Sequence, residues 1–164
     1  MSAHALRTLF TFPKNLKSGA RRSNAAVCHS LSHITKFDFG DGKGEVPAKR
    51  HNNPDGSLGG WVADTASVAP TAYIGPHAEV FGKAMVYGNA KVFGLAKVFG
   101  NARVGGDAMV YDTAWVFGNA RVCGGASVLD GARVSGNSIV RGTAKVWDCG
   151  RITGRTVIES GKHS

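Results

Sequence analysis

The sequence predicts an all-β fold: a parallel β-helix of five to six coils that follows an irregular N-terminal extension. Three observations support this prediction. An aliphatic residue recurs every six positions, and it is Val or Ile at all sixteen places from Val68 to Ile158. The residue two positions earlier is Ala at thirteen of these places, and the residue two positions later is Gly at ten. A hexad of this composition is typical of a short strand followed by a corner.

A helix does not accommodate the six-residue period. At about 100° per residue, six steps place successive Val side chains on three different sides of a helix, so no single apolar stripe forms. In a strand, residues two apart point to the same side, which places each Ala beside its Val. Val favours strands, and Gly supplies the left-handed backbone that a corner requires. Three hexads therefore close one triangular coil, and stacked coils exchange backbone hydrogen bonds.

The composition divides the chain into four segments. Residues 1–37 are basic and contain no acidic side chain. The formal net charge of the whole chain is +9. Two interpretations of this segment stay open, an organelle transit peptide and a disordered basic arm that contacts nucleic acid or an acidic partner. Residues 38–60 are rich in Gly, Pro, Asn and Asp and are expected to form a loop cap. Residues 61–160 form the predicted β-helix, and residues 161–164 form a short tail.

Cysteine usage and hydropathy restrict the location of the protein. No run of eighteen apolar residues is present, so we expect no membrane span. Three Cys residues, odd in number and far apart, fit neither a disulfide framework nor a metal-binding pattern, and they favour a reducing compartment. We therefore expect a cytoplasmic protein, or a mitochondrial or plastid one if residues 1–37 are a transit peptide.

The stretch "NNPDGSLGGWV", followed by "VFGKAMVYGNAKVFG", resembles a group of hexapeptide-repeat proteins of bacteria and their phages. Those proteins begin with a Gly-Gly-Trp-Val leader and continue with tandem Val-Phe/Tyr-Gly-Asn-Ala units. More broadly, the sequence is similar to the left-handed β-helix superfamily of acyltransferases, nucleotidyltransferases and γ-type carbonic anhydrases. The resemblance covers about residues 53–160. It implies left-handed winding and a homotrimer, and it makes a virion-associated protein the alternative to a cytoplasmic one.

The resemblance also suggests one catalytic candidate. Acyltransferases of the superfamily use a His as general base while CoA lies between subunits, and His77 is the one histidine within the repeats. The hexads here run without the inserted loop that builds an acceptor site in those enzymes. A solvated corner residue is therefore the other interpretation of His77. The γ-type carbonic anhydrases hold their metal with three histidines, which this repeat region does not supply, so we expect no metal and no other cofactor.

Three aspartates recur at eighteen-residue spacing and should stack on one corner; they are Asp112, Asp130 and Asp148. Stacked carboxylates could attract a cation. Asp also tolerates the corner conformation and bonds to local backbone, which is the interpretation we favour.

The residue after each Val forms two apolar files at the same spacing. One file is Phe81, Phe99 and Phe117, and the next is Phe93, Tyr111, Leu129 and Trp147. If these side chains point outward, a monomer leaves an apolar strip in water, which favours self-association into a homotrimer with aromatic anchors. The alternative is that the rings fold over the edge of their own prism.

Two polar files accompany the aromatic ones. Asn101, Asn119 and Asn137 are expected to exchange amide hydrogen bonds along their file. A basic row with one Trp is a candidate anion-binding face; it consists of Lys97, Trp115, Arg133 and Arg151. Such a row could hold an anionic polymer, but charged rows are commonly just solvated, and we do not expect nucleic-acid binding.

These observations predict a non-enzymatic structural, self-assembly or interaction module that forms a homotrimer. The alternative is an acyltransferase-like enzyme with His77 as general base, and a weaker alternative is a segment of a phage or cell-surface fibre. The sequence does not identify a small-molecule ligand.

Overall fold

The computed structural model describes residues 35–164. Most of the predicted basic segment, and with it the transit-peptide interpretation, lies outside the described residues. Residues 35–164 contain no helix, and hence none long and apolar enough to cross a membrane. The strands are β1 (Lys36–Asp38), β2 (Glu45–Asn52), β3 (Leu58–Ala63), β4 (Ser67–Val68), β5 (Tyr73–Ile74), β6 (Glu79–Val80), β7 (Met85–Val86), β8 (Lys91–Val92), β9 (Lys97–Val98), β10 (Arg103–Val104), β11 (Met109–Val110), β12 (Trp115–Val116), β13 (Arg121–Val122), β14 (Ser127–Val128), β15 (Arg133–Val134), β16 (Ile139–Val140), β17 (Lys145–Val146), β18 (Arg151–Ile152), β19 (Val157–Ile158) and β20 (Lys162–His163).

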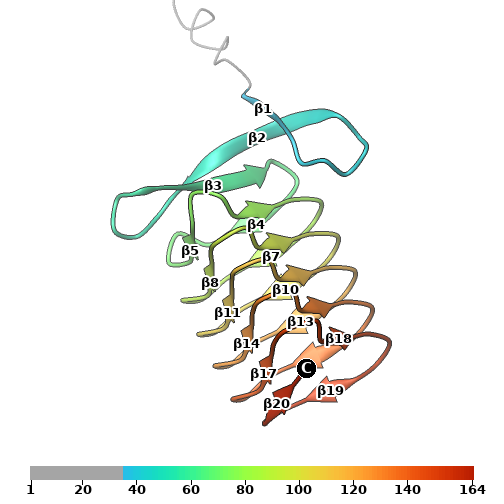
Figure 1. Cartoon of the computed structure of the whole chain (residues 1–164). Coiled ribbons are helices and arrows are strands. Elements are labelled where there is room, and N and C mark those ends of the chain that lie inside the picture. Colours follow the sequence, from blue (N-terminus) through green and yellow to red (C-terminus); the bar gives the residue numbers. More distant parts are fainter. Residues whose placement is uncertain (1–34) are drawn as a thin grey trace, which may run out of the picture. The chain divides into compact units, whose positions relative to one another are not determined.

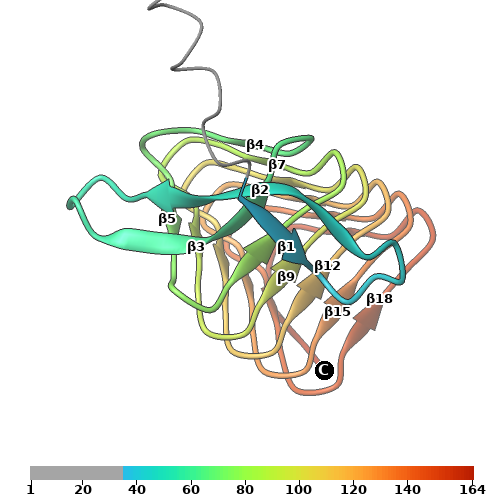
Figure 2. The ribbon, with the colours of Figure 1, turned by 90° about the horizontal axis from the view of Figure 1, so that it is seen from above.

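The strands from β3 onward stack into the three faces of a triangular prism (Figures 1 and 2). Face 1 has the order β3-β6-β9-β12-β15-β18, face 2 the order β4-β7-β10-β13-β16-β19, and face 3 the order β5-β8-β11-β14-β17-β20. Viewed from β3, the chain turns anticlockwise as it recedes, so the winding is left-handed (Figure 2). Six strands in each face make six coils, which confirms the predicted fold class and coil number.

The interior contains the repeated Ala and Val residues. Each coil lies in register with the next, so that Val104 pairs with Val122 and Val122 with Val140. All three side chains are fully buried. Burying one such side chain contributes about 1.5–3 kcal/mol, and the backbone hydrogen bonds between coils satisfy the polar groups that are buried with it. The core is therefore continuous from the first coil to the last.

Left-handed backbone forms the corners from Gly82 to Gly154, as the Gly and Asp positions predicted. Gly118 has φ +69°, and Asp112, Asp130 and Asp148 have φ values of 58°, 55° and 57°. The Asp148 amide also donates to Oδ2 of Asp130 over 3.4 Å. These conformations support the interpretation of the three aspartates as corner residues. No group of three His, Cys, Asp or Glu side chains within residues 35–164 is placed to hold a metal ion.

An antiparallel hairpin covers the first edge of face 1. Strand β2 pairs with β3 in the register Ala48↔Ala63, and β1 pairs with β2. The sequence predicted loops throughout residues 38–60, whereas the structure shows β2 and the first half of β3 there. Gly40, Gly42, Gly44 and Gly56 mark the two turns with left-handed backbone, whereas Gly59 and Gly60 lie within β3. Strand β2 forms because the unpaired backbone of β3 at the edge needs a partner.

Side chains complete the adjoining edge on face 3. Asn53, which is only 5 % exposed, accepts a hydrogen bond from the Ile74 amide over 2.8 Å and donates to the Ile74 carbonyl over 3.1 Å. The ring nitrogen Nε2 of His51 lies 3.0 Å from the Ala72 carbonyl oxygen. These side chains take the place of a neighbouring strand.

The repeat contracts by one residue in the last coil. Lys162 pairs with Lys145, seventeen positions earlier, whereas pairs elsewhere in the prism are eighteen apart. The predicted tail, residues 161–164, therefore contains strand β20. His163 occupies the position above Val146 that aliphatic residues hold in the earlier coils, and it is partly buried.

Candidate interaction surfaces

The first aromatic ladder, Phe81, Phe99 and Phe117, stacks along the corner between faces 1 and 2. Its ring centroids are 4.9 and 5.0 Å apart, and the planes differ by 1° and 2°. Phe39, from the loop after β1, extends the ladder by stacking on Phe81 at 4.8 Å. Phe81 is consequently only 6 % exposed. The chain's own hairpin covers this end of the first ladder, an arrangement that neither sequence interpretation included, while Phe99 and Phe117 are half-buried.

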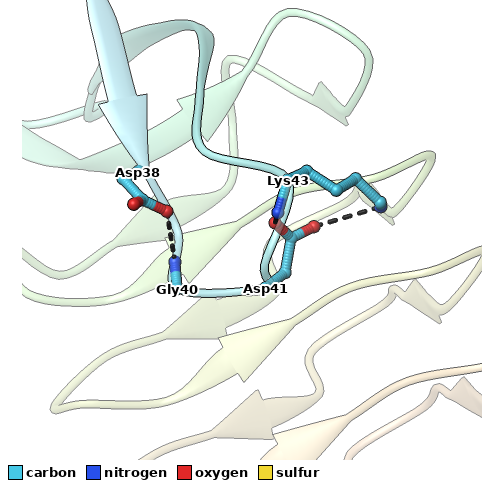
Figure 3. A network of polar contacts seen from close by, with 4 residues as sticks. All are labelled: Asp38, Gly40, Asp41 and Lys43. Atoms are coloured by element: carbon cyan, nitrogen blue, oxygen red, sulfur yellow. Dashed lines mark hydrogen bonds and ion pairs between the residues drawn. The ribbon is translucent and has the colours of Figure 1, made fainter.

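Short polar contacts shape the loop that carries Phe39 (Figure 3). Oδ1 of Asp38 accepts from the Gly40 amide over 2.8 Å, and Oδ1 of Asp41 accepts from the Lys43 amide over 3.1 Å. Nζ of Lys43 lies 3.1 Å from Oδ2 of Asp41. Hydrogen bonding from the Lys43 side chain, and then from its amide, lowers the pKa of Asp41.

A cleft of about 450 Å³ lies between this loop and the prism. Its apolar lining includes Phe39, Val46 and Phe81, and Lys83 and Asn101 also line it. Sequence reasoning missed the cleft because it depends on the hairpin packing against a distant corner.

The second aromatic ladder, Phe93, Tyr111, Leu129 and Trp147, lies on the corner between faces 3 and 1. Phe93 and Tyr111 stack at 4.9 Å with planes 4° apart. Trp147 is 42 % exposed at one end of the ladder, and Leu95, which follows Phe93 at the other end, is 59 % exposed. Among residues 35–164, no other aromatic ring stacks on this ladder. Burial raises the pKa of Tyr111, and the charges of Asp112 and Asp130 raise it further.

The predicted anion-binding row lies on face 1, where two of its cations have internal partners. Nζ of Lys97 lies 2.7 Å from Oε2 of Glu79, in an ion pair that lacks the alignment of a hydrogen bond. The Arg133 guanidinium lies over the Trp115 ring, 4.6 Å from its centroid, which is a cation–π contact. Arg151 is exposed at the end of the row. Anion binding on this face stays a prediction.

A basic groove lies on face 2 and was not predicted. It has a volume of about 690 Å³ and is lined by Lys83, Met85, Asn101, Arg103, Asn119, Arg121, Asn137 and Ile139. Its asparagines form the expected ladder, in which Asn101 donates to Asn119 over 3.1 Å and Asn119 to Asn137 over 3.0 Å. The sequence carried a signal for this site, because Arg103 and Arg121 recur eighteen residues apart.

His77 is exposed on the corner between faces 3 and 1. No hydrogen bond joins its ring to another residue within the described part of the chain, and no inserted loop forms a site around it. Its role as general base stays a prediction.

Comparison with known proteins returned no match: no family model fits the sequence, and no curated protein or solved structure is significantly similar to it. The fold therefore defines the class of protein, an all-β left-handed solenoid, and function must be inferred from its surfaces.

Proposed function

We propose that this protein is a non-enzymatic self-assembly module in which copies of the chain associate side by side through the second aromatic ladder. The observation that carries the proposal is an apolar strip that crosses several coils and includes a Trp side chain 42 % exposed. Soluble monomers rarely leave such a strip in water. The first ladder differs because its first ring lies beneath Phe39.

The preferred partner is a second copy of the same chain. The side chains of the ladder repeat at the spacing of the coils, so a parallel copy presents apolar groups at the same spacing. Tyr, Trp and Leu side chains at the centre of an interface supply large contact areas, and aromatic residues are common anchors of association. A single corner of a triangular prism fits a closed arrangement around a rotation axis. We propose three subunits, the number that the resemblance to the trimeric superfamily implies.

Sedimentation equilibrium tests this proposal. The wild-type chain should sediment at three times the monomer mass, and the double variant Tyr111→Lys with Leu129→Lys should sediment as a monomer. Tyr87→Lys, at an exposed aromatic residue on the remaining corner, is the matched control and should stay trimeric. Circular dichroism of each variant verifies folding. A monomeric wild type, or a double variant with unchanged mass, would refute the proposal.

A further inference from the structure

The basic groove on face 2 presents cations that no acidic side chain of the described residues neutralises. Arg103 and Arg121 occupy equivalent positions of consecutive coils and pair directly in register. The ion pairs within residues 35–164 involve other cations, namely Lys43, Lys97 and Arg141. Like charges opposite one another on neighbouring strands are unfavourable. An anion placed between the two guanidinium groups would relieve that repulsion.

The neighbouring asparagine ladder adds neutral hydrogen-bonding groups. Each amide has two N–H donors and an oxygen that accepts two hydrogen bonds. Asn119 uses one donor toward Asn137 and accepts one hydrogen bond from Asn101. One N–H and one acceptor position of its amide therefore stay available to a ligand. The groove thus offers two parallel rows, one cationic and one neutral, that both follow the prism axis.

We propose that this groove binds a linear acidic polysaccharide lying along the prism. Its carboxylates would contact Arg103 and Arg121, because guanidinium groups bind carboxylates in a bidentate manner. Its hydroxyls would contact the Asn ladder, which can donate and accept. The coils repeat at about 4.8 Å, a spacing comparable to the length of one sugar unit in an extended chain. Successive sugars would therefore meet successive coils.

The lining of the groove favours a glycan over a nucleic acid. Single-stranded nucleic acids bind on aromatic side chains that stack with the bases, and no aromatic residue lines this groove. Met85 and Ile139, near its two ends, offer apolar contacts suited to the faces of sugar rings.

The groove and the proposed self-assembly surface are compatible with each other. Face 2 lies between the corner of the first ladder and the corner of Tyr87, so it is opposite the corner that carries the second ladder. Association through the second ladder would leave every groove facing outward. Several outward grooves could then engage one long polymer and increase avidity. Binding by a single chain does not depend on that association.

Titration calorimetry with polygalacturonate, alginate and hyaluronan tests the proposal, with neutral dextran as control. At least one acidic polymer should bind to the wild type, more weakly as salt is raised, and dextran should not bind. The double variant Arg103→Gln with Arg121→Gln should lose affinity on the order of tenfold or more. The matched double variant Lys91→Gln with Lys145→Gln, at two exposed cations on face 3, should bind as the wild type does. Asn119→Ala should weaken binding without altering its salt dependence.

Three results would overturn the proposal. The first is that none of the three acidic polymers binds. The second is that the two double variants lose affinity equally, which would indicate unspecific attraction by net charge. The third is that a single-stranded DNA oligonucleotide binds more tightly than the best glycan. Melting temperatures of all variants, measured alongside, establish that they fold.

Discussion

Replacing Gly118 by Ala tests how tightly the coils stack at their corners. Gly118 has φ +69°, and a Cβ atom at this position would lie 3.0 Å from the Gly136 amide nitrogen in the next coil. Gly154 has nearly the same backbone, φ +70°, but a Cβ there would meet nothing within 4 Å. The two sites therefore share the left-handed conformation and differ in the contact between coils.

The expected magnitudes follow from that difference. A left-handed non-Gly residue costs about 1–2 kcal/mol, and the loss of unfolded-state freedom offsets about 0.4–1 kcal/mol of this. Gly154→Ala should therefore destabilise the protein by about 1 kcal/mol. Overpacking typically adds about 1–3 kcal/mol, and the lower end applies because Asp residues are accommodated at equivalent corners. Gly118→Ala should destabilise by about 2 kcal/mol.

Guanidinium denaturation followed by far-ultraviolet circular dichroism measures both variants at one protein concentration. Equal destabilisation of the two would refute the reasoning, because it would mean that the coil above Gly118 makes no contact that matters. A neutral Gly118→Ala would show in addition that the left-handed backbone is not required.

Two further predictions concern the first edge and the second ladder. Asn53→Ala should destabilise the fold by about 2–3 kcal/mol, because it leaves the amide and carbonyl of Ile74 without partners; the exposed Asn52→Ala should have little effect in the same denaturation assay, and equal effects would contradict this role. The phenol of Tyr111 should titrate above its usual pKa of 10.0, as measured by ultraviolet absorbance against Tyr111→Phe. Because the pKa of the Tyr111 phenol is raised in the folded state, the stability that the phenol contributes is present below pH 10.0 and is lost as the pH rises through the folded pKa. Titration of the phenol at its ordinary pKa would contradict the burial of the ring.

The strictly periodic part of the fold could be predicted from the sequence. Each hexad repeats the same pattern of small, aliphatic and corner residues. The strand at Val104 and the left-handed corner at Asp112 therefore follow from residues only a few positions away. The Asn ladder was predictable for the same reason, since its spacing equals one coil. Local patterns specify such a structure because every coil contacts only its neighbours.

The aperiodic parts depended on contacts that sequence spacing does not reveal. Phe39 stacks on Phe81 across 42 residues, and nothing in the turn-rich segment around Phe39 indicates that partner. The basic groove combines the arginine file on face 2 with the asparagine ladder at the adjoining corner. Both files could be read from the sequence, but their joining into one hollow depends on how the corner projects its side chains.

The constant register between the coils before the last contraction makes the length of this prism independent of its cross-section. Because Arg103 stands over Arg121 and these coils repeat after eighteen residues, duplicating one block of eighteen residues would lengthen the rod and leave its surfaces aligned. Duplicating a single hexad would also keep Val over Val. It would, however, move every later residue from its face of the prism to the next face. The residues that follow the inserted hexad would then no longer continue the arginine file on face 2. Both insertions keep the apolar core intact, but only the eighteen-residue insertion preserves the alignment of the surface residues.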